Sequence, residues 1–172
     1  MTKPQVIEHD GVLVVRDDLF PGGTKARYLP LLFDAADEVV YASAAEGGAQ
    51  TALATVAAQI GKRATIFVAR RTQPHPRVLM AKRLGAKIME VSPGYLSTVQ
   101  ARARDYSREV GARLAPFGVD TPEATEAIAA AARSIGIHPD EVWCASGSGV
   151  LARALERAWP KRGDTSFRLA EL

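Results

Sequence analysis

The run Ala64-Thr-Ile-Phe-Val-Ala69 is the feature that most constrains the fold of this chain. Its residues are almost all apolar, and several are β-branched or aromatic. A strand with one solvated face alternates apolar and polar residues, whereas a continuous apolar strand is typical of a parallel sheet covered on both faces. Parallel strands need crossover connections, which are usually helices. The run therefore predicts an α/β fold.

The rest of the sequence alternates strand and helix patterns around this run. Strands are predicted at residues 11–16, 38–43, 64–69, 86–91 and 141–145, with a short one within 113–118. Helices are predicted at residues 24–32, 49–60, 78–84, 95–114, 121–135 and 150–158, and the segment 161–172 is expected to be polar and peripheral. We expect one α/β domain over residues 1–172, with a parallel sheet and helices on both faces.

Composition excludes several classes of protein and of site. The 22 Lys and Arg residues exceed the 19 Asp and Glu residues only slightly, and aromatic residues make up 6% of the chain, so a nucleic-acid surface is not favoured. The only cysteine is Cys144 and the three histidines are scattered, so no metal site is expected. The sequence has no apolar run of membrane-spanning length and no secretory signal, so a cytoplasmic location is expected.

Three glycine-rich loops are candidate ligand sites. Ligands of α/β sheets bind beyond the carboxyl ends of the strands, where free amides at a helix start favour an anion. Ser146-Gly-Ser-Gly149 could hold a phosphate in this way, and Glu46-Gly-Gly-Ala-Gln-Thr51 a carboxylate. In Pro21-Gly-Gly-Thr-Lys25, a partly buried lysine with a lowered pKa could act as a nucleophile. An ordinary turn would explain Ser146–Gly149 equally well. Taken alone, the loop at Glu46 is more often an ordinary turn, and a lysine near glycines is more often a solvated cation.

The order of these segments resembles the fold-type II pyridoxal 5'-phosphate (PLP) enzymes, which share the tryptophan synthase β-like fold. The likeness is greatest to the branch with aminocyclopropane-carboxylate (ACC) deaminase and D-cysteine desulfhydrase, and cysteine synthase is similar. The family's Gly-Gly-x-Lys falls on Gly22-Gly-Thr-Lys25, and its glycine-rich phosphate loop falls on Ala145-Ser-Gly-Ser-Gly149. The Ala-rich helix at 52–61, the strand at 64–68 and the Gly-Ala turn within 80–91 follow the family order.

The resemblance implies a role for each loop. Lys25 would be the catalytic residue and would hold PLP as an aldimine, with Ser146, Gly147, Ser148 and Gly149 on the cofactor phosphate. Gly48 would also contact the cofactor, and the substrate carboxylate would bind at Gly47, Ala49, Gln50 and Thr51. Residues 36–115 would correspond to the small subdomain, and residues 12–35 and 116–160 to parts of the large one. The implied reaction is a lyase, deaminase or decarboxylase reaction on an amino acid or an amino-acid-like adduct.

The sequence departs from the family in two places. It has Glu46, Gly48 and Ala49 where the family has polar side chains such as asparagine, so backbone amides would remain for the ligand and Glu46 would repel an anion. Family members also continue for a further hundred residues or more past the phosphate loop. Either a neighbouring subunit of a homo-oligomer completes the site, or the scaffold belongs to a non-catalytic binding protein.

A phosphoribosyltransferase-like protein that binds phosphoribosyl pyrophosphate (PRPP) is the other alternative. An apolar strand, two acidic residues and a Gly-x-Thr turn form the phosphate and ribose site of those enzymes, and Val12 to Thr24 is similar to that motif. In this interpretation Asp17 and Asp18 would bind the ribose hydroxyls. The turn is one residue shorter than in the motif.

Overall fold

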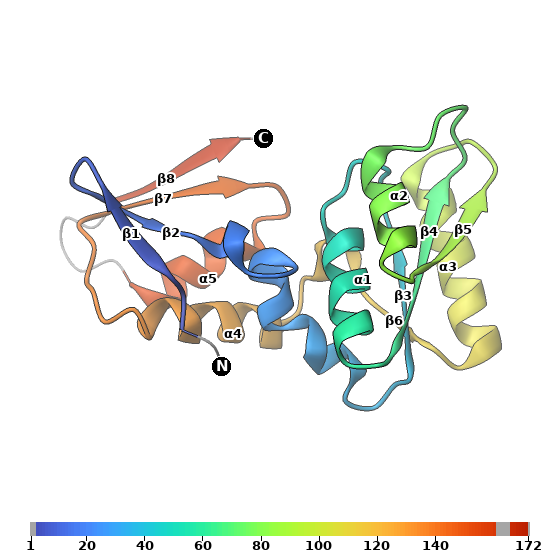
Figure 1. Ribbon diagram of the computed structural model, residues 1–172, viewed down its shortest axis with the longest axis horizontal. Helices are drawn as coiled ribbons and strands as arrows, with labels where there is room; N and C mark the ends of the chain where they lie inside the picture. Colours follow the sequence, from blue (N-terminus) through green and yellow to red (C-terminus); the bar gives the residue numbers. More distant parts are fainter. Residues whose placement is uncertain (1–2, 161–165, 172) are drawn as a thin grey trace. The chain divides into compact units, whose positions relative to one another are not determined.

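The computed structural model describes residues 3–160 and 166–171, which divide into two compact units. One unit combines residues 1–28 with residues 120–172, and the other is formed by residues 29–119. In Figure 1 the first unit holds the dark-blue start and the orange to red end of the chain, and the second holds the light-blue to yellow segments between them. The single α/β domain expected from the sequence, with its family-based subdivision, stays a prediction.

The unit 29–119 is built on a four-stranded parallel sheet with the strand order β5-β4-β3-β6. The strands are β3 (Glu38–Ala42), β4 (Arg63–Ala69), β5 (Lys87–Val91) and β6 (Arg113–Leu114). All five residues of β3 are buried, and β4 pairs with it in register from Glu38 opposite Arg63 to Ala42 opposite Phe67. The parallel sheet predicted from the sequence is therefore confirmed.

Helices cover both faces of this sheet. Figure 1 shows α1 (Ala49–Gln59) and α2 (Pro76–Arg83) on one side and α3 (Leu96–Val110) on the other. Pro76 begins α2, and the backbone N–H of Arg77 donates to Nδ1 of His75 at 3.2 Å, which caps that helix.

The prediction of one helix from 95 to 114 was wrong at its end. Gly111 has φ of 68°, a left-handed conformation that ends α3 and that glycine adopts without steric cost. The chain then turns so that Arg113 and Leu114 form β6 beside β3. Leu114 fits the apolar face of the predicted helix and would also fit an apolar strand. The spacing of apolar residues alone therefore did not show whether Leu114 belongs to the helix or to a strand.

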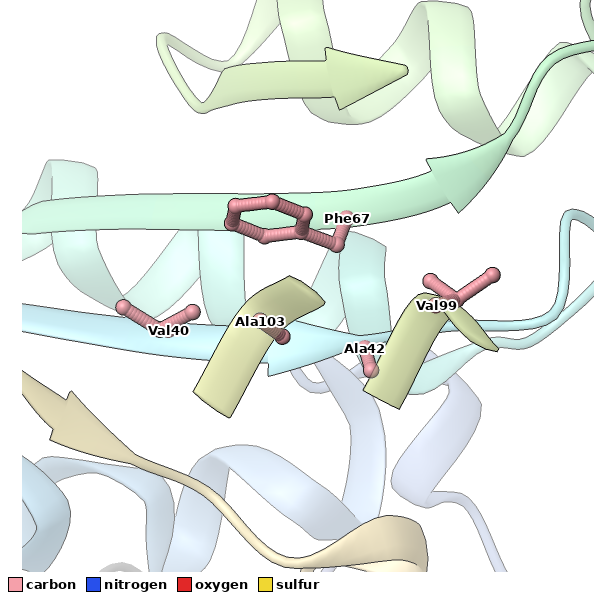
Figure 2. Packing of buried hydrophobic residues seen from close by; sticks show 5 residues of the cluster. All are labelled: Val40, Ala42, Phe67, Val99 and Ala103. Atoms are coloured by element: carbon pink, nitrogen blue, oxygen red, sulfur yellow. The ribbon is translucent and has the colours of Figure 1, made fainter. Parts of the chain in front are cut away.

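A cluster of small and β-branched residues joins the sheet to α3. Val40 and Ala42 of β3 and Phe67 of β4 pack against Val99 and Ala103 of α3 (Figure 2). The Phe67 side chain is the largest member, is only 4% exposed, and its ring centroid lies 5.5 Å from that of Tyr106. Burial of this ring and the close approach allowed by the two alanines fix α3 on the sheet.

We predict that Phe67→Ala destabilises the protein by about 3–5 kcal/mol, because it removes a buried ring and leaves a cavity. Urea unfolding followed by circular dichroism measures the change. Phe117→Ala is the matched control, because that ring is 52% exposed, and it should cost about 0.5 kcal/mol or less. Equal losses for the two variants would contradict this account of the core.

The other unit combines elements from both ends of the chain. An antiparallel hairpin pairs β1 (Val6–His9) with β2 (Val12–Val15), and β7 (Glu141–Ser146) pairs in parallel with β8 (Ser166–Glu171). The helices are α4 (Pro122–Arg133) and α5 (Val150–Ala158), and two short 3-10 helices are η1 (Asp17–Leu19) and η2 (Gly23–Arg27). The Thr121 hydroxyl accepts a hydrogen bond from the Ala124 N–H at 3.1 Å, the N-cap expected from the sequence.

Two sequence expectations differ from these elements. The helix expected at residues 24–32 is instead η2 followed by a second 3-10 helix, η3 (Leu29–Phe33), since Pro30 has no N–H for a continuous α-helix. The expectation of a merely peripheral polar segment at 161–172 was wrong for Ser166–Glu171, which form β8 beside β7. Residues 161–165 and 172 lie outside the described residues.

Among the helices of the described chain, none combines the length and the apolar composition needed to cross a bilayer. The cytoplasmic location expected from the sequence stays a prediction.

Candidate functional site

Lys25 lies in η2, directly after the Gly22–Gly23 turn, and its side chain is half-buried. Within the described part of the chain, no hydrogen-bond or ion-pair partner holds its ammonium group. Burial lowers the pKa of Lys25 from its ordinary value, because the charged form loses hydration without gaining a counter-ion. A lysine in this state is neutral, and therefore nucleophilic, over a wider pH range than a solvated one.

The neighbouring cation Arg27, in contrast to Lys25, has a carboxylate partner. Its guanidinium donates to both carboxylate oxygens of Asp17, at 3.0 Å from Nε and 2.5 Å from Nη2, and lies 4.9 Å from the centre of the Phe20 ring. This bidentate pair links η2 to η1 and so fixes the helix that carries Lys25. It also gives Asp17 a partner other than Lys25, which leaves the lysine amine uncompensated.

Both acidic residues of the phosphoribosyltransferase alternative are paired with arginines. Asp17 accepts from Arg27, and Asp18 accepts from Nε and Nη2 of Arg16, both at 2.8 Å. Hydroxyl groups of a ribose would have to compete with these charge-assisted bonds. This geometry does not favour the alternative.

The loop Ser146–Gly149 connects β7 to α5. Gly149 is the N-cap of α5 with φ of 78°, and no side chain caps the first turn. The first-turn N–H groups therefore remain available, and the helix dipole adds positive potential at the same place. The Arg153 Nη1 atom would lie 3.0 Å from a Cβ atom at Gly149, so a guanidinium also borders the loop, and its Nη2 atom donates to the Asp120 carboxylate at 2.6 Å. These donors suit an anion.

The loop Ser43–Gly48 connects β3 to α1. Of the residues predicted to bind the substrate, Gly47 lies in this loop, and Ala49, Gln50 and Thr51 lie in the first turn of α1. A Cβ atom on Gly47 would lie 2.8 Å from Ser43 Oγ, so a larger residue does not fit there without a shift. Gly48 is the N-cap of α1 and has no side chain to occupy the first-turn amides. Thr51 donates its hydroxyl to the Gly48 carbonyl at 2.9 Å, so this side chain is tied to the backbone.

Gln50 is fully buried and its carboxamide is directed into the same loop. Its Nε2 donates to the carbonyls of Ala45 at 2.7 Å, Gly47 at 3.0 Å and Ala44 at 3.3 Å. Its Oε1 has no hydrogen-bond donor among the described residues. The side chain thus shapes the loop from inside and leaves one buried acceptor unsatisfied.

Two arginines from the loop after β4 and from α2 approach Glu46. Arg71 Nη2 donates to the Glu46 carboxylate at 3.2 Å, and Arg77 Nη1 donates to the Glu46 carbonyl. The salt bridge offsets the negative charge that was expected to repel an anion. Neither arginine was singled out as part of the site, although the rule that ligands bind beyond the carboxyl ends of strands applies equally to the segment after β4.

The described chain contains no group of three or more His, Cys, Asp and Glu side chains arranged for a metal ion. Lys25 and the loop Ser146–Gly149 belong to one compact unit, whereas residues 47–51 belong to the other. Each unit therefore carries a helix start without a side-chain cap at the end of a parallel strand, and the first also carries the lysine.

The parallel sheet with its loops at the strand ends defines an α/β protein of the kind that binds small ligands. The chain belongs to the family described as pyridoxal-phosphate dependent enzymes, whose family model matches residues 5–169. The resemblance seen in the sequence is thereby confirmed. Membership of this family implies PLP-dependent amino-acid chemistry in general.

Solved structures of this family share the fold. An ACC deaminase homologue is 21% identical with a TM-score of 0.73, over 85% of this chain and 50% of that chain. Maize serine racemase is 16% identical with a TM-score of 0.74, over 90% and 51% of the two chains. The processed form of threonine deaminase isoform 2 from Solanum lycopersicum is 17% identical with a TM-score of 0.70, over 92% and 46%. The chain thus spans about half the length of the structures that it matches, and at these identities the likeness shows the fold alone.

A search of curated proteins found no match.

The donor set fits two groups of PLP, its phosphate and its reactive aldehyde. The uncapped first turn of α5, bordered by Arg153, fits a phosphate, and the half-buried amine of Lys25, which has no partner among the described residues, fits an aldehyde.

We predict that Lys25 is acylated by acetic anhydride at a lower pH than an ordinary lysine is. A lowered pKa means that the neutral amine is present at a lower pH, so the labelling rate should rise earlier as the pH increases. Peptide mass spectrometry over a pH series measures this for each lysine. Exposed Lys82 is the internal control, and coincident profiles for the two lysines would contradict the prediction.

Proposed function

We propose that this chain carries out PLP-dependent lyase, deaminase or decarboxylase chemistry on an amino acid or an amino-acid-like adduct, with Lys25 as the catalytic residue. The single observation that supports this most is the state of Lys25: half-buried, without a counter-ion among the described residues, and with its pKa lowered by burial. Membership of the family supplies the chemical context for such a lysine.

The loop residues would bind and orient the reactants. The amides of Gly147, Ser148 and Gly149, with the Ser146 and Ser148 hydroxyls, are the donors proposed for the cofactor phosphate, and Arg153 adds positive charge beside them. Gly47, Ala49, Gln50 and Thr51 are proposed for the substrate carboxylate, and Gly48, the N-cap of α1, is proposed as a further contact of the cofactor. The backbone amides there take the place of the side-chain amide typical of the family.

Lys25 Nζ is the proposed acid and base. PLP, when bound, supplies an electron sink that stabilises negative charge at the substrate α-carbon. A neutral amine at Lys25 can accept the α-proton, hold it away from water, and return it or pass it to a leaving group. Its lowered pKa favours this step, because the amine is available as a base at a lower pH than a solvated lysine would be.

The decisive experiment combines the full chain with PLP. We expect a visible absorption band of lysine-bound cofactor, fixed by borohydride as a mass increment on the Lys25 peptide. Lys25→Ala should lose both signals, whereas the control Lys82→Ala, at an exposed lysine of α2, should retain them. Absence of the band in the wild-type protein would overturn the proposal and favour the non-catalytic binding protein instead.

Completion of the site by a neighbouring subunit stays a prediction that the same material can test. A homo-oligomer should be visible by sedimentation or light scattering, and PLP should stabilise it if the cofactor contacts both subunits. A strictly monomeric protein that binds PLP through Lys25 would retain the proposed chemistry and remove the role of the second subunit.

A further inference from the structure

The strands β2 and β7 each have one edge without a partner. Within the described residues, β2 pairs only with β1, and β7 pairs only with β8. The backbone N–H and C=O groups on the other edge of each strand have no hydrogen-bond partner among those residues. An unpaired strand edge is a template on which another strand can pair.

Both strands border the same cavity, which has a volume of about 770 Å³. Its lining includes Val12–Val15, the whole of β2, and residues 142–144 of β7. Since the side chains of a strand alternate between two faces, a run of consecutive lining residues means that each strand borders the cavity with its edge. One edge of β7 is occupied by β8, so the cavity lies along the unpaired edge.

The helices α4 and α5 contribute apolar side chains to this cavity. Ile128 of α4, Leu155 of α5 and Trp159 are among them. The strands add apolar surface that is still open to solvent, because Val12 is 59% exposed and Trp143 is 67% exposed. Exposed apolar surface of this kind marks an interaction site. The cavity thus combines an apolar wall with two rows of unpaired backbone groups.

The size of the cavity matches one extended segment. Five residues of a strand are about 17 Å long, with about 4.8 Å between neighbouring strands and about 10 Å between layers, so such a segment fills roughly 800 Å³. A hairpin of two strands would need twice that volume. A small apolar molecule could fill the space, but it would leave the donors and acceptors of both edges unpaired.

The charges in the cavity favour a basic group at one end. Besides Asp140, four residues that can carry a charge line it: Asp17, Arg27, His138 and Glu141. Asp17 is paired with Arg27, and Glu141 with Arg168 at 3.1 Å. Asp140 is exposed, and no cation pairs with it within the described part of the chain. Its carboxylate precedes β7, so the negative charge lies where that strand begins.

We propose that this cavity binds an extended segment of another polypeptide, which inserts as a strand between β2 and β7. The segment carries β-branched apolar residues that face α4 and α5, and a basic residue beside Asp140. Main-chain hydrogen bonds to the two edges supply affinity, and the contacts of alternate side chains supply specificity. The inference goes beyond the proposed function, because it concerns a protein partner and not the cofactor.

The test is a titration of the full-length, 15N-labelled protein with the capped peptide acetyl-Lys-Val-Thr-Val-Thr-Val-amide. Its valines share one face and its threonines the other, as a strand with one apolar face requires. We expect saturable NMR shifts of the amides of residues 12–15 and 142–144. The same peptide N-methylated at both threonines keeps its side chains but loses two N–H donors, so its Kd should be about tenfold higher or more.

A charge exchange tests the position of the basic residue. A peptide with Glu in place of Lys should bind about two- to fivefold more weakly to the wild type, because Asp140 is exposed. Asp140→Asn should remove this difference between the two peptides. Asp105→Asn, at an exposed carboxylate of α3 in the other unit, is the matched control and should retain it.

Three outcomes would overturn the proposal. The first is no saturable binding of the peptide, or shifts outside the two strands. The second is equal affinity for the N-methylated peptide, which would identify the cavity as a site for apolar molecules. The third is a dimer by sedimentation that the peptide does not dissociate, which would identify a second copy of this chain as the occupant. Peptide binding needs no PLP, so this test and the test of Lys25 fail independently.

Discussion

The burial of β3 is the constraint on which the unit 29–119 depends. All five residues of this strand are buried, and its backbone groups pair with β4 on one side and β6 on the other. Such a strand is stable only when helices cover both faces of the sheet, and parallel neighbours place the carboxyl ends of the strands at one edge. The segments after β3 and β4 consequently meet, and Arg77 reaches the Glu46 carbonyl.

Charge compensation separates Lys25 from the arginines near it and near the loop Ser43–Gly48. Arg27, Arg16 and Arg71 each have a carboxylate partner. Lys25 has none among the described residues, and Arg77 is held there only by a carbonyl. An uncompensated cation at a half-buried position, such as Lys25, costs free energy unless a ligand completes it.

Much of the architecture could be predicted from the sequence, because it depends on local patterns. The apolar run at residues 64–69, the Thr121–Pro122 helix start and the α5 boundaries are strong signals that the structure bears out. The short strand predicted within residues 113–118 is β6, whereas the helix predicted over 95–114 ran too far and the strand β8 was missed. Arg113–Leu114 and Ser166–Glu171 become strands through pairing with β3 and β7.

The sequence by itself determined the α/β class, the two glycine-rich helix starts and the family, because these are properties of residue order and spacing. Only the tertiary structure decided how the charges are distributed among partners. It paired Asp17 with Arg27 and Glu46 with Arg71, turned Gln50 inward, and brought Arg77 from α2 to the start of α1. These contacts join residues from separate elements, and the packing of the elements fixes which donor meets which acceptor.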